Sequence, residues 1–195
     1  MVIIDSGHGV NTFGKISPIW GDGTQLYEYE FNRDISRRIS RGLDKYNIKN
    51  NILVPEVIDL SLKVRCDRAN RLYEKFPGSF LVSIHGNAGT KPNEGTGWEI
   101  WTSPGETESD KIATYFYNEA KRTLKEFKIR SDYIDGDPDK ESKFYILTHT
   151  NCPAVLTENL FFDNEVDCHY MMSEKGRENI STLHINAIIN YLKTN

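Results

Sequence analysis

The sequence lacks any apolar run as long as the roughly 18 residues that a membrane-spanning helix needs. Its first residues, MVIIDSGHG, contain neither a basic stretch nor a long apolar segment, so no signal peptide is visible at the start of the chain. We therefore expect no insertion into a membrane. A protein of this kind that acts outside the cell would leave the cytoplasm by another route, or would have had its signal removed.

Positive charge is not in excess either, because 24 lysines and arginines face 28 aspartates and glutamates and the formal net charge is −4. A protein that neutralises a run of phosphates needs a basic surface, so we expect no nucleic-acid partner. Cysteine is scarce as well. An odd number of cysteines in 195 residues argues against a disulfide framework and predicts reduced, buried thiols at Cys66, Cys152 and Cys168.

The composition that is present, 38% hydrophobic and 27% charged residues, is typical of a globular domain. Short apolar runs alternate with segments that carry one apolar stripe at helical spacing, which is typical of α/β proteins. We therefore predict a single α/β domain over residues 1–195, with a mostly parallel or mixed twisted sheet of about six strands and helices on both faces. Strands are expected at residues 2–4, 52–54, 80–84, 97–102 and 154–157.

Apolar residues recur every three or four positions in four further segments, which predicts helices at residues 31–43, 62–76, 112–127 and 180–192. Candidate N-caps are Ser61, Ser109 and Ser173. Two stretches lack periodicity, residues 9–25 and 130–142, and long loops in a compact domain are often functional. Residues 135–139 are rich in aspartate, but they lack the glycine and glutamate spacing of an EF-hand calcium loop, so we expect a solvated turn.

Polar side chains follow three of the predicted strands at the points where the apolar runs end. His8 follows the first strand, His85 follows the strand at residues 80–84, and Glu158 follows the strand at residues 154–157. In an open α/β sheet, ligands bind outside the carboxyl ends of the strands. If these three strands are parallel neighbours, their polar residues converge on one site.

Glu28 adds a fourth group to this site. It lies three residues before Phe31, so a helix that begins near residue 28 turns Glu28 towards the sheet. Glu30 lies about 200° further round the helix axis and should face elsewhere. A buried carboxylate is costly unless a cation accompanies it, and a metal ion is one such cation.

His8, Glu28 and His85 make a His₂Glu set with an open fourth position, which is the composition of a catalytic zinc site. Zinc lowers the pKa of its water to about 7, and Glu158 could pass the proton of that water to a leaving amine. The same residues allow structural interpretations, in which the histidines are hydrogen-bonded structural groups and Glu158 caps a helix. The remaining histidines lack such a setting and are expected to be ordinary: His149, His169 and His184.

Six short motifs follow one another along almost the whole chain. They are Asp5-Ser6-Gly7-His8-Gly9; Glu28 with Asn32; Leu62, Arg65, Ala69 and Asn70; VSIHGN at residues 82–87; GTGWE at residues 95–99; and PAVLTE at residues 153–158 with Phe162 and Asn164. In this order they resemble the zinc-dependent N-acetylmuramoyl-L-alanine amidases of the amidase-3 type. That family includes catalytic domains of phage endolysins and bacterial cell-wall hydrolases.

The resemblance implies that His8, Glu28 and His85 are the ligands of one catalytic Zn²⁺ and that Glu158 is the catalytic glutamate. It implies a peptidoglycan hydrolase that cleaves the amide between the lactyl group of N-acetylmuramic acid and the L-alanine of the stem peptide. Residues 127–144 match no motif of the family. The chain also departs from the family at Ser6 (proline in the family), Gly86 (alanine), Thr157 (apolar) and Asn159-Leu160 (a glycine-containing stretch).

Two other functions stay open from the sequence, a zinc amidase or peptidase for another substrate and a non-catalytic wall-binding module. Asn87 either orients a ligand or substrate or is a turn residue, and Trp20 and Tyr27 could flank the cleft. The expected partner is a muramyl peptide of peptidoglycan, and a monomer is assumed. Without a visible signal peptide, a phage-type lysis enzyme is favoured, with a secreted or periplasmic hydrolase as the rival.

Overall fold

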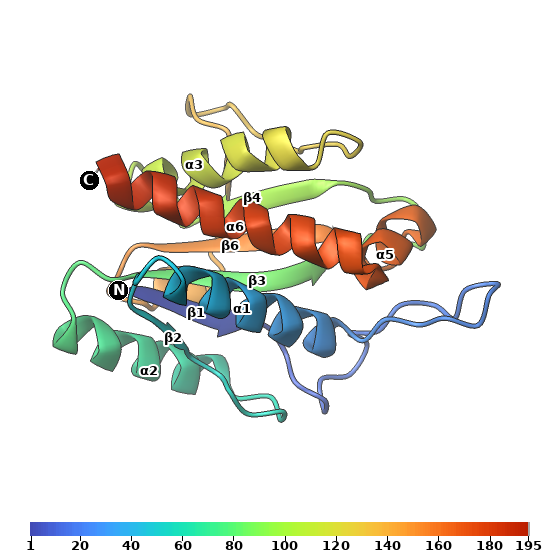
Figure 1. Ribbon diagram of the computed structural model, residues 1–195, viewed down its shortest axis with the longest axis horizontal. Helices are drawn as coiled ribbons and strands as arrows, with labels where there is room; N and C mark the ends of the chain where they lie inside the picture. Colours follow the sequence, from blue (N-terminus) through green and yellow to red (C-terminus); the bar gives the residue numbers. More distant parts are fainter. Residues whose placement is uncertain (195) are drawn as a thin grey trace.

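The structure is a computed structural model that describes residues 1–194, and a mixed sheet divides it into two helical layers (Figure 1). The strands are β1 (Val2–Ser6), β2 (Asn50–Ile52), β3 (Phe80–Asn87), β4 (Trp98–Thr102), β5 (Lys140–Glu141) and β6 (Ala154–Phe161). They lie in the order β2–β1–β3–β6–β4–β5. Neighbouring strands are parallel except for the antiparallel pair β4 and β6, which confirms the predicted mixed sheet.

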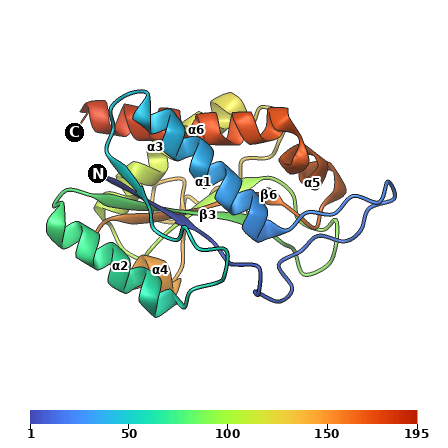
Figure 2. The ribbon, with the colours of Figure 1, turned by 60° about the horizontal axis from the view of Figure 1, so that its bottom comes forward.

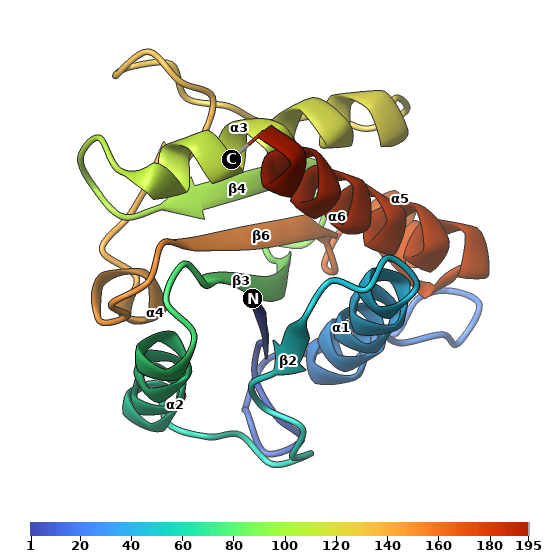
Figure 3. The same ribbon diagram turned by 60° about the vertical axis from the view of Figure 1, so that its left-hand side comes forward.

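Helices cover both faces of this sheet, as predicted (Figure 2). They are α1 (Glu28–Asp44), α2 (Leu62–Lys75), α3 (Glu108–Thr123), α4 (Tyr145–Thr148), α5 (Glu165–Met172) and α6 (Glu174–Thr194). Figure 3 shows α2 and α4 on one side of the sheet and α1, α3 and α6 on the other. No helix within residues 1–194 is both long enough and apolar enough to cross a membrane.

The two helical layers correspond to two hydrophobic clusters, because successive strand residues point to opposite faces of the sheet. Ile4 and Val82 contribute to the larger cluster with α1, α3 and α6. Ile3 and Leu81 contribute to the smaller cluster with α2 and α4. Strands covered on both faces are therefore continuously apolar, as the sequence had indicated. The three cysteines are buried with free thiols, as predicted.

Several predicted boundaries are wrong. The strands β3 and β6 continue past their apolar runs, through residues 87 and 161, so His85 and Glu158 lie inside strands and not after them. Strand β2 begins two residues earlier than expected. Helix α3 ends at residue 123, although the apolar pattern continues to 127. Three short elements of two to eight residues, β5, α4 and α5, were not predicted from the sequence.

One of the predicted helix caps is also wrong. Ser61 caps α2 by accepting a hydrogen bond from the backbone N–H of Val64, as expected. Helix α3 is capped by Thr107, and Ser109 lies within the helix, where its hydroxyl accepts from the N–H of Ala154. The Ser173 hydroxyl accepts from the N–H three residues later, as an N-cap of α6 would.

The aspartate-rich segment at residues 135–139 is not a solvated turn throughout. Asp139 is buried, and its Oδ2 accepts a hydrogen bond from the Thr102 hydroxyl at the end of β4. The segment therefore folds back against the sheet. Burial and the neighbouring Asp137 and Asp110 carboxyls raise the pKa of Asp139.

Candidate active site

The turn after β1 carries His8 in a left-handed backbone conformation with φ of 59°. The glycines on either side are required by close contacts. A Cβ on Gly7 would lie 2.3 Å from Cε1 of His85, and a Cβ on Gly9 would lie 2.0 Å from the backbone nitrogen of Asp59. The Gly-His-Gly sequence therefore allows the chain to pass directly beside His85.

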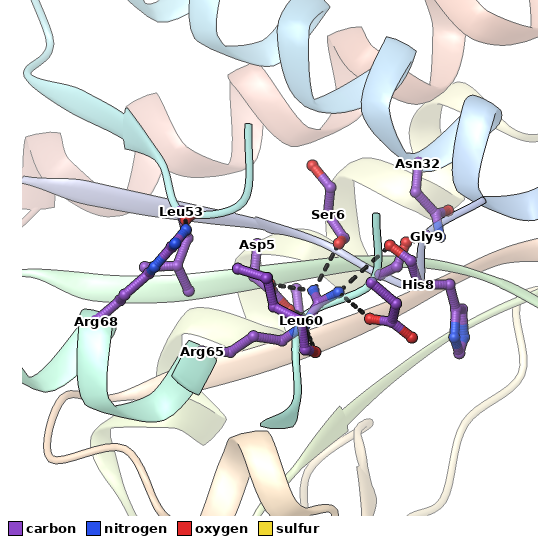
Figure 4. A network of polar contacts seen from close by, with 12 residues as sticks. Asp5, Ser6, His8, Gly9, Asn32, Leu53, Leu60, Arg65 and Arg68 are labelled. Carbon is purple, nitrogen blue, oxygen red and sulfur yellow. Dashed lines mark hydrogen bonds and ion pairs between the residues drawn. The ribbon is translucent and has the colours of Figure 1, made fainter. Parts of the chain in front are cut away.

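A buried arginine from α2 holds this turn (Figure 4). Nη1 of Arg65 donates to Oδ1 of Asp5 at 2.7 Å and to the carbonyl oxygen of Ser6 at 2.6 Å. Its Nη2 donates to Oδ1 of Asp59 at 2.8 Å and to the carbonyl oxygen of His8 at 3.3 Å. Arg65 and Asp5 are both only 2% exposed. The arginine thus connects α2 with the end of β1 and with the backbone of His8.

Glu28 is the first residue of α1 and is fully buried, while Glu30 is exposed, as the helical geometry predicted. Oε1 of Glu28 accepts hydrogen bonds from the N–H of Gly86 and from Nδ2 of Asn32, both at 3.2 Å. Oε2 is buried and has no hydrogen-bond partner among the described residues. Nζ of Lys15 lies 3.7 Å from it. A buried carboxylate oxygen without a hydrogen bond is suited to a bound cation.

The structure brings His8, Glu28 and His85 together. Oε1 of Glu28 lies 3.4 Å from Nε2 of His8 and 3.3 Å from Nδ1 of His85. One donor atom from each residue lies within 4.8 Å of the others, and the two imidazole rings meet edge to face. Two imidazoles and one carboxylate are a donor set that divalent transition metals, zinc among them, bind well. The residues therefore fit a metal ion.

Burial and mutual contacts shift the pKa values of the three clustered side chains. Burial opposes ionisation of Glu28, but the hydrogen bond and charge of His85, with the charges of His8 and Lys15, lower its pKa to about 2. Burial lowers the pKa of His8 to about 4, so this imidazole is neutral at pH 7 and able to donate its lone pair. For His85, the hydrogen bond to Glu28 and the nearby carboxylates outweigh burial and raise its pKa.

Glu158 lies on β6, directly opposite His85 on β3. It lies inside a strand and therefore does not cap a helix. Its Oε2 is buried without a hydrogen-bond partner among residues 1–194. Burial, together with the charge of Glu28, raises the pKa of Glu158 to about 8 in spite of the opposing charge of His85. The site thus contains one strongly acidic and one weakly acidic glutamate, the separation expected of groups with different roles.

A hollow opens in the surface beside these residues. It is lined by Asp5, Gly7, His8, Asp59, Leu60, Ser61, Leu62, Arg65, His85 and Ile146. In Figure 1 the arrowheads of β1 and β3 point to the end of the molecule at which the connection from β1 to α1 also lies. Because β1, β3 and β6 are consecutive parallel strands, their polar residues converge there, as the sequence analysis required.

Comparison with known proteins identifies the family. Residues 2–190 match the family model Amidase_3, described as N-acetylmuramoyl-L-alanine amidase. The chain belongs to this family. Over 96% of its length this amidase is 26% identical to the N-acetylmuramoyl-L-alanine amidase CwlM of Bacillus licheniformis, of which it covers 66%. Over 97% of its length it is 25% identical to the uncharacterized protein YqiI of Bacillus subtilis, of which it covers 84%.

Solved structures agree with the family. The crystal structure of an N-acetylmuramoyl-L-alanine amidase from Clostridium difficile 630 superimposes with a TM-score of 0.83 at 27% identity, covering 98% of this chain and 96% of that one. The catalytic domain of CwlV from Bacillus (Paenibacillus) polymyxa has the same fold, with a TM-score of 0.79 at 21% identity over 100% and 98% of the two chains. The protein is thus an N-acetylmuramoyl-L-alanine amidase, a hydrolase of a family that acts on peptidoglycan.

The departures from the family pattern after Glu158 have local explanations in this amidase. Leu160 adopts a left-handed conformation with φ of 71°, which a glycine would adopt without strain. Nδ2 of Asn159 donates to the carbonyl oxygen of His85 at 2.9 Å. The hydroxyl of Thr157 lies 3.0 Å from Nε2 of His184, so a polar residue is accommodated on this buried face.

The structure places the other three candidate residues of the amidase, Trp20, Tyr27 and Asn87, outside the His-Glu-His cluster. Trp20 is only 8% exposed and packs in the larger core cluster, so it does not flank the cleft. Tyr27 is 44% exposed and lines a separate hollow with residues 10–16. Asn87 donates to Oε1 of Glu99 at 2.8 Å and makes no hydrogen bond to the three clustered side chains.

The three remaining histidines do not join the cluster. His184 is a buried residue of α6, His149 stacks on Tyr145, and His169 contacts Asp22. Arg65, as the residue that holds the His8 turn, and Lys15, beside Glu28, were not predicted from the sequence. For Arg65, the available signal was a basic residue beside the apolar stripe of α2. For Lys15, which lies in a loop without periodicity, no signal was available.

Proposed function

We propose that this amidase hydrolyses the bond between the lactyl group of N-acetylmuramic acid and the L-alanine of the stem peptide, using one catalytic Zn²⁺ held by His8, Glu28 and His85. Residues 1–195 act as one catalytic domain, and Glu158 is the general base. The observation that carries the proposal is the His-Glu-His cluster with a buried, unpartnered carboxylate oxygen, next to a second glutamate of raised pKa.

Zinc in such a site acts as a Lewis acid towards the scissile carbonyl and lowers the pKa of water. Glu158 accepts a proton from the attacking water, and because burial raises its pKa, its carboxylate form is a stronger base than that of an exposed glutamate. The same carboxyl then donates that proton to the nitrogen of the departing L-alanine. Arg65 contributes indirectly, because it fixes the backbone of His8.

The alternatives are weaker. A wall-binding module gains nothing from two unpartnered buried carboxylate oxygens, which cost free energy in the folded state. A different amide substrate would use the same four side chains, and the family to which the chain belongs favours peptidoglycan. We accordingly propose the cell wall as the place of action, reached either in phage-type lysis or after secretion.

The decisive experiment is mass spectrometry of purified peptidoglycan after digestion, with a chelator-treated sample as the control. The proposal expects stem peptides with a free N-terminal L-alanine, and expects them to disappear after chelation and return with zinc. Cleavage within the stem peptide would contradict the named bond while leaving the metal site in place. Absence of any cleavage by zinc-loaded, folded protein would contradict the proposed activity.

The role of Glu158 has its own test. Glu158→Gln keeps the shape of the side chain but removes the basic oxygen, so turnover should fall by about 10²–10⁴-fold. Zinc affinity, measured by titration, should change little, because Glu158 is not in the ligand set. Glu30→Gln is the matched control, because it makes the same replacement at an exposed glutamate, and it should retain full activity. Near-normal turnover of Glu158→Gln would refute the assignment.

A further inference from the structure

A row of side chains crosses the sheet beside the proposed catalytic groups. His85 on β3 lies opposite Glu158 on β6, and Glu158 lies opposite Glu99 on β4. Directly opposite residues point to the same face of a sheet. Glu99 is therefore the next side chain in the row after the general base, although it is 3% exposed and has no part in the reaction described above.

Two cations are bound to Glu99. Nε of Arg130 donates to its Oε2 at 2.6 Å, and Nζ of Lys140 donates to the same oxygen at 2.8 Å. Its other oxygen accepts hydrogen bonds from Nδ2 of Asn87 and Nε1 of Trp101. Although burial opposes ionisation, Lys140 and Arg130 lower the pKa of Glu99. The Glu99 carboxylate is thus ionised, and each of its oxygens accepts two hydrogen bonds. Together with Arg130 and Lys140 it forms a group with a net charge of +1.

The backbone fixes both cations at this edge of the sheet. Residues 128–130 run beside the start of β4, with the N–H of Arg130 donating to the carbonyl oxygen of Trp98 at 2.8 Å. Gly97 permits this approach, because its φ is +101° and an added Cβ would lie 2.2 Å from the carbonyl oxygen of Lys128. Lys140 opens β5, which pairs with the end of β4.

Aromatic rings and partial exposure complete the arrangement. The guanidinium carbon of Arg130 lies 5.3 Å from the centre of the Phe161 ring, and Nζ of Lys140 lies 4.6 Å from the centre of the Trp101 ring. The two cationic side chains are 32% and 21% exposed. Within residues 1–194, the Nη donors of Arg130 make no hydrogen bond, and the only hydrogen bond of the Lys140 ammonium group is the one to Glu99. Oriented donors therefore remain for an anion from outside.

We propose that Arg130 and Lys140 form a subsite for a carboxylate of the stem peptide, namely that of the residue after L-alanine. This inference rests on the proposed function and names which part of the substrate lies along β4 and β5. The N-acetylated sugars are uncharged and the lactyl carboxyl is consumed in the scissile amide, so the negative charges of this substrate lie on its peptide. Guanidinium and ammonium groups recognise carboxylates by charge-assisted hydrogen bonds.

The distances fit such a placement. Neighbouring strands lie about 5 Å apart, so Glu99 is one strand spacing from Glu158, which donates the proton to the leaving nitrogen. An extended peptide spans about 3.5 Å per residue. The second residue of the leaving peptide therefore reaches the cations that flank Glu99.

The test compares two muropeptides that differ only at the second stem residue, which is D-glutamate in one and D-isoglutamine in the other. For zinc-loaded wild-type protein, KM for the carboxamide substrate should be at least about tenfold higher, with kcat little changed. Arg130→Gln and Lys140→Met should each reduce this ratio of KM values. Arg130→Lys, which keeps the charge, should preserve most of it.

Lys125→Met is the matched control, because it removes one exposed positive charge of the same segment without touching Glu99, and its KM ratio should equal that of the wild type. Each variant is checked for folding by circular dichroism and thermal melting. Hydrolysis of both substrates with equal KM by the wild type would overturn the subsite and leave the proposed function standing.

Failure to hydrolyse either substrate would overturn the proposed function instead. In that case, calorimetric titration of the zinc-loaded protein with the two free stem peptides still decides the subsite. It expects about tenfold tighter binding of the peptide with D-glutamate. Equal binding, or no binding of either peptide, would refute the subsite without the use of any variant.

Discussion

At the scale of single residues, the absence of side chains is as important as their presence in this site. Gly7 leaves room for the imidazole of His85, which occupies the space that a Cβ at residue 7 would need. The flanking glycines therefore do more than form a turn. They bring two imidazoles, one from the turn after β1 and one from β3, within reach of the Glu28 carboxylate.

Gly7→Ala should consequently weaken metal binding. The added methyl group would collide with His85 at 2.3 Å and displace the ring, and we expect zinc affinity to fall by about 10–100-fold, as for the loss of other groups that orient ligands. Zinc titration with a competing chelator measures the change. Gly21→Ala is the control, since no atom lies within 4 Å of a Cβ at that position. Equal affinities in the two variants would contradict the steric argument.

His184 shows how burial changes the chemistry of a single residue far from the cleft. Its Nδ1 donates to the carbonyl oxygen of Ile180 at 2.7 Å, so Nε2 is free to accept from the hydroxyl of Thr157. This arrangement requires the neutral ring. Burial accordingly lowers the pKa of His184 to about 4, although the bond to Ile180 acts in the opposite direction.

His184 should make the fold sensitive to acid. Below pH 6.5 this histidine binds a proton in the unfolded chain but stays neutral in the folded protein. Stability that is fully present above pH 6.5 is therefore lost as the pH falls towards 4. A pKa of about 4 in the folded protein, against 6.5 in the unfolded chain, corresponds to a loss of about 3 kcal/mol. Urea unfolding at pH 7 and pH 4.5 measures it. In His184→Gln the decrease should be smaller, and an identical decrease in both proteins would argue against this histidine.

At the scale of elements, the link between α2 and β1 organises the cleft. Arg65 lies on α2 and Asp5 on β1, and the pair closes over the loop that carries His8. The Ser83 hydroxyl on β3 donates to the second oxygen of Asp5 at 2.7 Å, so three elements share one buried network. The position of the His8 loop therefore depends on how α2 packs on the sheet.

Arg65→Met should destabilise the protein, because it leaves Asp5 buried without its cation. The expected loss in the free energy of unfolding is about 3–5 kcal/mol, and zinc affinity should fall as well. Arg71→Met removes an exposed arginine from the same helix and should change stability by about 0.5 kcal/mol or less. Chemical denaturation of both variants tests the difference. Similar losses in the two variants would show that the buried pair of Arg65 and Asp5 contributes no more to the free energy of unfolding than an exposed arginine does.

At the scale of the whole molecule, the site depends on the strand order. A histidine from the turn after β1 and one from β3 meet a glutamate from the start of α1 and another from β6, and these residues are up to 150 positions apart in the chain. The carboxylates Glu28 and Glu158 come close only in the folded protein, where each keeps an oxygen without a hydrogen bond. A cation that binds there compensates a cost that the fold itself creates.

Metal binding should therefore be visible as global stability. A ligand present at 100 times its Kd adds about 2.7 kcal/mol, which corresponds to a rise in Tm of about 5–10 °C for a domain of this size. Differential scanning calorimetry with zinc and with chelator measures the shift. His8→Ala should abolish it. A Tm that is the same with zinc and with chelator in the wild type would speak against the site.

The fold could be predicted largely from local patterns. Alternating apolar runs and stripes indicated an α/β domain, and polar residues at the ends of three runs indicated the location of the site. Short elements such as β5 and α4 were not predicted, because segments of two to four residues are too short to show a periodic pattern. The predicted strands at residues 80–84 and 154–157 were too short, because the strand pairing of β3 and β6 continues through the polar residues His85 and Glu158.

Local patterns in the sequence identified the residue types of the candidate site and their place at the ends of apolar runs, since apolar periodicity and chain order are local properties. Which of these groups meet depends on the tertiary structure. It placed β1, β3 and β6 side by side, buried Glu28 against both histidines, and brought Arg130 and Lys140 to Glu99 from a segment without any recognisable motif. These contacts depend on the order of the strands and on which side chains meet across the sheet, and the spacing of residues along the chain fixes neither of them.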